Sequence, residues 1–451
     1  MYEDSLALLR ASKSDFYDIF VEQTTLKVVE IKSGKVERMS VGELGGVGVR
    51  LTRGLSTLFA SSTDSSESSV YSLARFLTGI AEPTEGVHLT TVAPEKGLEL
   101  YGGYPAEDEY LKEIFETINE TGYASDLIKQ ISITYSEKQR RVEIYNEQMK
   151  HLSQTLTYTT LFIEMTAKKG DVVQSLRRPL GVLGGSDYLK GVDFKGIVAG
   201  MRERLIELLD APPLKAGKMS VVLSSSAGGT MIHEAVGHGL EADLVYESMS
   251  VYKDRVGQQV ASPKISVVDD ATRPGMRGSY LFDDEGTPAQ NTLLIENGVL
   301  KGYMFDKTYA KISGMESTGN ARRASFKHVP VVRMSNTYIL PGNDDPEEIV
   351  ASVDDGLLVK QMGGGQVNPV TGDFVFEVSE GYKIENGKVG HLVRGATLVG
   401  NGPKVLREID MVGNDFGVEV GTCGKSGQGV PVTDGEPTLR IPSILVGGSA
   451  L

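Results

Sequence analysis

A chain of 451 residues with 40% hydrophobic residues is long enough for two domains with substantial cores. Its 46 basic and 60 acidic residues give a net charge of −14, which argues against nucleic-acid binding because that requires a basic surface. The single cysteine excludes an intrachain disulfide, and neither a signal peptide nor an apolar run of the ~20 residues that span a bilayer is found, so we expect a cytoplasmic protein with no membrane partner.

The first half of the chain predicts helices mixed with antiparallel strands. The evidence is β-prone runs around Ser33-Gly34 and apolar residues at helical spacing after the capping residue Asp64. The predicted elements are a hairpin at 27–41, a strand-like region at 47–60, helices at 65–78 and 110–118, and a strand at 152–165. Glycine-rich residues Leu180 to Gly191 are the predicted linker.

The second half predicts few helices and many strands. A patterned helix at 194–209 stops before Pro212-Pro213. A short strand at 219–223 and a small-residue turn at 224–229 then lead to a helix that carries His233. From residue 264 onwards strands dominate, with hairpins at Asn297-Gly298 and Asn386-Gly387, since Asn-Gly accepts the positive φ of such turns.

The fold class is therefore α+β. We expect an N-terminal mixed α/β domain over residues 1–185 and a β-rich C-terminal domain over residues 190–451, the latter carrying the helix of His233. Arg322 and Arg323 form a local basic patch, which we expect to be a solvated loop rather than a nucleic-acid site.

The segment His233-Glu234-Ala235-Val236-Gly237-His238 has the residues of a zinc hydrolase motif, in which a helix holds two histidines beside a glutamate base. Such histidines usually stand at i and i+4, about 40° apart around the helix. Here they stand at i and i+5, which an ideal α-helix separates by about 140°. We therefore predict a departure from α geometry at Val236 to Gly239, such as a π-type turn, which the glycines permit.

Two histidines need a third partner, because a catalytic zinc site usually has three protein ligands and an open fourth position. The candidates are Glu241, Asp243, Asp269-Asp270, the other histidines and Cys423. Cys423 lies in an apparent glycine-rich turn over residues 421–425, where Lys425 would favour a thiolate. A lone cysteine is more often a small buried hydrophobe. The residues alone leave the third ligand open, and a fourth protein ligand would make the site structural instead.

Four blocks of sequence point to a known family when they are taken together. They are Met231–Glu241, which contains H-E-x-x-x-H, and Arg333–Tyr338, Thr422–Pro431 and Pro437–Ile441. These blocks resemble the TldD branch of the TldD/PmbA metallopeptidase family. The resemblance covers most of residues 190–451 and, more loosely, the N-terminal half. One departure is Ser426, where many members have Asp.

The resemblance implies a zinc-dependent peptidase with one zinc ion per active subunit. It makes His233, His238 and Cys423 the metal ligands and Glu234 the general base on a zinc-bound water. It also implies a dimer, either a homodimer or a heterodimer with a PmbA-like (TldE) subunit. We expect the substrates to be unfolded or extended peptides that add to an exposed strand edge.

Three other functions compete with this interpretation of the sequence. The alternative within the family is a non-catalytic PmbA-like subunit, which would lack the metal motif. A nucleotide-binding loop at Gly424-Lys425-Ser426 fails, because Glu419 stands where the loop needs Gly. A serine hydrolase needs Gly-x-Ser-x-Gly, which the sequence does not contain.

Overall fold

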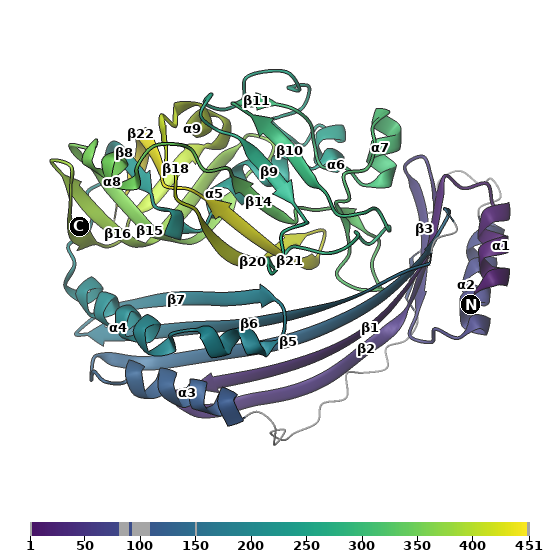
Figure 1. The fold of residues 1–451 in the computed structure, drawn as a ribbon, viewed down its shortest axis with the longest axis horizontal. Coiled ribbons are helices and arrows are strands. Elements are labelled where there is room, and N and C mark those ends of the chain that lie inside the picture. The colour runs from purple at the N-terminus through teal and green to yellow at the C-terminus, as the bar shows by residue number, and fades with distance from the viewer. Residues whose placement is uncertain (1, 81–89, 93–108, 149–150, 449–451) are drawn as a thin grey trace.

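The computed structural model describes residues 2–80, 90–92, 109–148 and 151–448, and it has two halves (Figure 1). A large curved sheet forms the N-terminal half, with helices on its outer face. The C-terminal half lies against the other face of this sheet and contains two further large sheets. The mixture of helices and strands confirms the α+β class. None of the helices in the described ranges is both long and apolar enough to span a bilayer.

Long alternating apolar and polar runs give the N-terminal half seven strands in the order β4-β3-β2-β1-β5-β6-β7. The strands are β1 Phe16–Lys32, β2 Lys35–Arg53, β3 Ser56–Ser62, β4 Thr90–Val92, β5 Ile128–Asn146, β6 His151–Lys169 and β7 Val172–Leu183. Neighbouring strands are antiparallel, except that β3 and β4 are parallel. Ser33 and Gly34, with φ of 49° and 75°, join β1 to β2 and confirm the first predicted hairpin.

Four helices cover the outer face of this sheet (Figure 1). They are α1 Glu3–Ala11, α2 Glu67–Ile80, α3 Glu109–Gly122 and α4 Phe194–Asp210. The helices predicted at 65–78, 110–118 and 194–209 are thus confirmed. The buried faces of α3 and α4 share one apolar cluster with β5 and β6, so α4 packs on the N-terminal sheet. The domain boundary between residues 185 and 190 stays a prediction.

The predicted linker from Leu180 to Gly191 is wrong, because most of it is regular structure. Strand β7 stays paired with β6 as far as Leu183, and Ser186–Gly191 forms a 3-10 helix, η1. Leu189 of this helix is buried in the cluster beneath α4. Glycines therefore mark only a short break here, at Gly184 and Gly185.

Two sheets form the C-terminal half. The six-stranded sheet has the order β11-β10-β9-β14-β21-β20, and the seven-stranded sheet runs β15-β8-β22-β18-β16-β17, with β19 beside β22. The first contains β9 Val267–Asp270, β10 Asn291–Glu296, β11 Val299–Leu300, β14 Asn336–Ile339, β20 Gly417–Lys425 and β21 Gln428–Glu436. The second contains β8 Gly217–Leu223, β15 Asp355–Val367, β16 Asp373–Glu385, β17 Lys388–Val393, β18 Thr397–Asn401, β19 Met411–Val412 and β22 Leu439–Gly447. A separate pair consists of β12 Ala321–Arg322 and β13 Val331–Val332.

Both Asn-Gly hairpins are confirmed. Asn297-Gly298 joins β10 to β11, and Asn386-Gly387 joins β16 to β17, with all four residues at positive φ. Short helices fill the remaining connections, namely α6 Ala242–Tyr246, α7 Lys307–Ser313, α8 Pro346–Ala351 and α9 Gly402–Glu408. One apolar core runs between the two sheets and includes residues of the segment around His233.

Buried ion pairs connect the two halves. Three of them cross the junction: Arg50–Glu285 at 2.6 Å, Arg140–Asp284 at 3.1 Å and Arg323–Asp18 at 3.0 Å. All six residues are buried. The predicted solvated loop at Arg322 and Arg323 is therefore wrong, since Arg322 is also buried and donates to two backbone carbonyls. These arginines are structural.

Candidate metal centre

The segment that carries both histidines follows the carboxyl end of β8. A 3-10 turn, η2 Ser225–Ala227, leads through Gly228 and Gly229 into one short helical turn, α5 Thr230–Ile232. Both glycines have positive φ, 95° and 80°, and a Cβ on Gly229 would meet the backbone of Gly435 in β21 at 2.5 Å. The two glycines thus let the chain turn closely over β21 just before His233.

The backbone leaves α geometry at the motif, as the i, i+5 spacing of the histidines predicts. Residues His233–Gly237 form a π-helical turn, η3, and His238–Leu240 form a 3-10 turn, η4. The departure begins earlier than the predicted Val236 to Gly239. Because a π turn bonds residue i to residue i+5, it brings the two rings back to one side of the helix. Their centroids lie 5.1 Å apart.

The glycines of the motif are required for packing rather than for unusual φ. Gly237 has an ordinary helical φ of −55°. A Cβ at Gly237 would overlap the sulfur of the fully buried Met334, and one at Gly239 would lie 2.7 Å from the Tyr252 ring. Because these two residues have no side chains, the turn can pack closely against Met334 and Tyr252 in the core.

Replacing Gly237 with Ala is expected to destabilise the folded chain by about 1–3 kcal/mol, because the added methyl has no space beside Met334. Thermal unfolding against the unmodified chain measures the effect. Gly424→Ala is the matched control, since a Cβ there meets nothing within 4 Å. Equal unfolding temperatures for the two variants would contradict this account of the turn.

Cys423 lies inside strand β20, so the turn predicted over residues 421–425 is wrong. The turn comes later, at Ser426 and Gly427, which have positive φ. Strand β20 is the last strand of its sheet and pairs with β21, where Cys423 lies opposite Val430. The cysteine is 3% exposed and belongs to the apolar core. It is thus both buried, as a small hydrophobe would be, and directed toward the histidines.

His233, His238 and Cys423 converge within the fold. One nitrogen of each ring and the sulfur all lie within 4.8 Å of one another, and Cys423 Sγ is 3.5 Å from His238 Nε2. Among the described residues, no fourth His, Cys, Asp or Glu joins this group. These three are the ligands that the resemblance implies, and their nearest atoms can hold one metal ion.

Carboxylates orient both imidazoles from behind. His233 Nδ1 lies 2.7 Å from Asp434 Oδ1, and His238 Nδ1 lies 3.0 Å from Glu241 Oε2. Because a carboxylate accepts, each Nδ1 carries a proton, and Nε2 is the ring nitrogen through which each histidine would bind a metal ion. Lys425 in turn donates to Glu241 at 2.9 Å and to Asp243 at 2.7 Å. Lys425 therefore supports the carboxylates rather than the thiolate.

Without a metal ion, the electrostatics of the site favour the charged forms of Cys423, His238 and Glu241. Burial opposes ionisation of Cys423, but hydrogen bonds and charge from the two histidines lower the pKa of its thiol to about 6. Burial likewise opposes charge on His238, whereas Glu241 and Cys423 raise its pKa to about 10. Burial would raise the pKa of Glu241, but His238 and Lys425 lower it to about 2. A thiolate and a carboxylate therefore face the two rings.

The other candidate ligands have different roles. Glu241 contacts the Nδ1 side of His238, and Asp243 pairs with Lys425. Buried Asp269 accepts from Ser335, Thr337 and Asn320, so it organises backbone next to the site. The other described histidines lie elsewhere: His151 stacks on Tyr145, His328 contacts Ser325 and His391 is exposed. His88 lies outside the described residues.

Glu234 lies between the two histidines in the π turn and is partly exposed. Within the described chain, no hydrogen bond or ion pair engages its carboxylate.

Sequence reasoning did not identify Asp434. It lies 201 residues from its partner His233, and no local pattern marks it. Only the register of β20 against β21, which places Asp434 on the face of Cys423, reveals it.

Comparisons with known proteins agree along the whole chain. Residues 216–448 match the model of the PmbA/TldA metallopeptidase C-terminal domain, and residues 17–81 match domain 1 of the same family. A metalloprotease TldD homolog of Haemophilus influenzae is 34% identical, covering 96% of this chain and 93% of its own. A metalloprotease of Methanothermobacter thermautotrophicus is 30% identical and covers 99% of both chains.

Solved structures show the same fold. A protein of Thermotoga maritima, described as a modulator of DNA gyrase, superposes with a TM-score of 0.79 at 20% identity, covering 99% of both chains. TldE of Thermococcus kodakarensis superposes with a TM-score of 0.75 at 21% identity, covering 99% of this chain and all of its own.

Proposed function

The chain belongs to the TldD/PmbA metallopeptidase family, and from this membership we propose that it is a zinc-dependent peptidase whose metal is held by His233, His238 and Cys423. The convergence of these three donors carries the proposal. A non-catalytic PmbA-like role would not need them.

The types of the donor residues fit zinc, and so does the separation of Cys423 from His238. Ligands about 2.3 Å (sulfur) and 2.1 Å (nitrogen) from a tetrahedral ion are roughly 3.6 Å apart, and Cys423 Sγ lies 3.5 Å from His238 Nε2. Four acidic side chains accompany the ammonium of Lys425, namely Cys423, Asp434, Glu241 and Asp243, and a divalent cation would offset their charge. Nitrogen and sulfur donors favour zinc over harder ions.

The chemistry divides between the ion and the protein. When bound, the metal supplies a Lewis acid that acidifies a water molecule and polarises the scissile carbonyl. Glu234 would take the proton of the attacking water and pass it to the leaving nitrogen, a role its partly exposed and unengaged carboxylate allows. Asp434 and Glu241 hold the rings in one tautomer and orientation.

The topology supports extended peptides as substrates. Strand β20 carries Cys423 and is the edge strand of its sheet, so an extended peptide has a strand edge beside the metal ligands. Backbone pairing of this kind selects unfolded segments rather than particular side chains. We further propose a dimer, either of two copies or with a PmbA-like subunit such as the TldE that shares this fold.

Removal of the metal tests the proposed function. After dialysis against a chelator, the chain is expected to lose hydrolysis of an unfolded peptide and to regain it when zinc is added to about one ion per chain. Hydrolysis is measured by peptide mass spectrometry and metal by elemental analysis. Full activity in the metal-free chain, confirmed by elemental analysis, would disprove the proposal.

A further inference from the structure

A cluster of positive charge lies where the two halves meet, in a chain whose net charge is −14. A cavity of about 300 Å³ opens there between β7, α4, β15 and β16. Its polar lining consists mainly of four cations, one carboxylate and a serine: Arg177, Arg178, Arg204, Lys360, Glu380 and Ser226. Because the chain as a whole is acidic, this cluster of cations suggests a site that binds an anionic group.

Two of the four cations are already neutralised. Arg204 Nε lies 3.0 Å from Glu380 Oε2, and Arg177 pairs with Glu164 at 3.3 Å. Within the described ranges, no hydrogen bond or ion pair engages the headgroup of Arg178 or Lys360. The Lys360 ammonium therefore lines the cavity without a partner among the described residues, and the Arg178 guanidinium makes no hydrogen bond to them but lies in electrostatic contact with Glu419.

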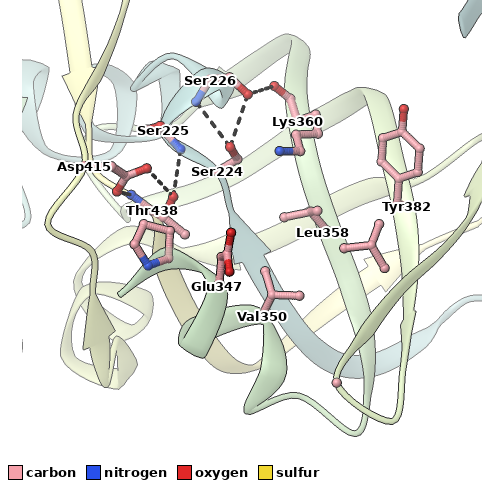
Figure 2. Close-up of a pocket in the computed structure, with 13 residues that line it drawn as sticks. Ser224, Ser225, Ser226, Glu347, Val350, Leu358, Lys360, Tyr382, Asp415 and Thr438 are labelled. Atoms are coloured by element: carbon pink, nitrogen blue, oxygen red, sulfur yellow. Dashed lines mark hydrogen bonds between the residues drawn. The ribbon is translucent and has the colours of Figure 1, made fainter. Parts of the chain in front are cut away.

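A larger cavity of about 750 Å³ adjoins the first and shares Ser226 and Lys360 with it (Figure 2). The Ser226 hydroxyl donates to the backbone carbonyl of Lys360 at 2.8 Å, so the serine turn η2 is attached to β15. Ser226 follows the carboxyl end of β8, and Lys360 follows the part of β15 that pairs with β8 in parallel, which ends at Val359. The joint space can hold several residues of a peptide.

The cavities connect to the metal centre through strand β20. A Cβ on Gly417, the first residue of β20, would overlap the backbone oxygen of Ser225. Cys423 lies six residues further along the strand, about 20 Å at the rise of an extended chain. A peptide of about six extended residues along β20 could therefore reach from the metal ligands to Ser225, which lines the larger cavity that adjoins the cationic one.

We propose that this cationic cavity binds a carboxylate of the peptide substrate, through Arg178 and Lys360. The inference rests on the proposed peptidase function, since peptides supply the carboxylate, either at the C-terminus or on an acidic side chain. A guanidinium presents a planar fork that matches a carboxylate, and an ammonium adds a point charge. The site selects substrates that end in, or carry, an acidic group about six residues from the cleaved bond.

Calorimetric binding to the full chain tests the proposal. Three acetylated eight-residue peptides of Ala and Ser are compared: one with a free C-terminal carboxylate, one with a C-terminal amide, and one amide with Glu as its last residue. All measurements use the Glu234→Gln background, so that no peptide is hydrolysed. The free acid is expected to bind about tenfold more tightly than the plain amide. Tight binding of the Glu peptide would extend the site to side chains, and weak binding would restrict it to the terminus.

The double variant Lys360→Met with Arg178→Leu is expected to bind acid and amide equally. Both residues are exposed, and unchanged circular dichroism and thermal unfolding verify the fold. Lys218→Met is the matched control, an exposed lysine of β8 that lines neither cavity, and it should keep the preference. Equal binding of acid and amide by the parent chain, or a preference that survives the double variant, would overturn the proposal. Hydrolysis assays decide the peptidase function separately.

Discussion

Glu234→Gln is expected to lower peptide hydrolysis by about a hundred- to ten-thousandfold, the range that general acid-base catalysis contributes. The amide cannot accept the proton of the attacking water, although it has nearly the same shape as the carboxylate. The metal should stay, because the assigned donor atoms belong to His233, His238 and Cys423. Initial rates on an unfolded peptide and elemental analysis of the same sample measure both quantities.

The control for this variant is Glu247→Gln, which changes an exposed carboxylate directly after α6, nine residues beyond His238. It is expected to keep the parent rate. If Glu234→Gln kept more than a tenth of that rate, Glu234 would not be the base. If the variant lost its metal as well, the loss of activity would say nothing about proton transfer.

Cys423→Ala is expected to weaken metal binding by more than a hundredfold and to abolish hydrolysis with it. The thiolate is one of only three donors, so its removal costs more than loss of a hydrogen-bonded outer partner, which typically costs 10- to 100-fold. Titration against a competing chelator measures the affinity. A variant with undiminished affinity would show that the sulfur is merely buried beside the two rings.

Asp434→Asn is the comparison variant for this experiment, with an expected loss of metal affinity smaller than that of Cys423→Ala. It keeps all three donors and changes only the partner of His233 Nδ1. We expect its metal affinity to fall by about 10- to 100-fold, between the parent chain and Cys423→Ala. This order of the three proteins separates a metal ligand from a residue that positions one.

Local patterns predicted local structure well. Asn297-Gly298 and Asn386-Gly387 demand positive φ, and both form hairpins. The five-residue spacing of His233 and His238 predicted the π turn, because no regular α-helix can bring such residues to one side. In each case the signal lies within a few residues of the structure that it predicts.

Features that depend on distant partners were misread or missed. Gly421 and Gly424 suggested a turn around Cys423, but the pairing of β20 with β21 keeps this segment extended. Arg323 appeared to be a solvated loop residue, because its partner Asp18 is 305 residues away. Asp434 was missed for the same reason. Sequence spacing carries no information about which strand faces which when the partners are remote.

The ion pairs across the junction also bear on how the chain reaches its fold. Synthesis proceeds from the N-terminus, so the first sheet emerges from the ribosome well before its counterpart. The face of this sheet that will contact the C-terminal half carries Asp18, Arg50 and Arg140. Water solvates these charged groups until their partners Arg323, Glu285 and Asp284 have been synthesised. A face made only of apolar residues would instead promote association of the nascent chain with other protein molecules. The sheet face also carries Phe20 and Ile144, which pack on Phe282, so the charged residues make it less apolar and favour the one arrangement in which the ion pairs form.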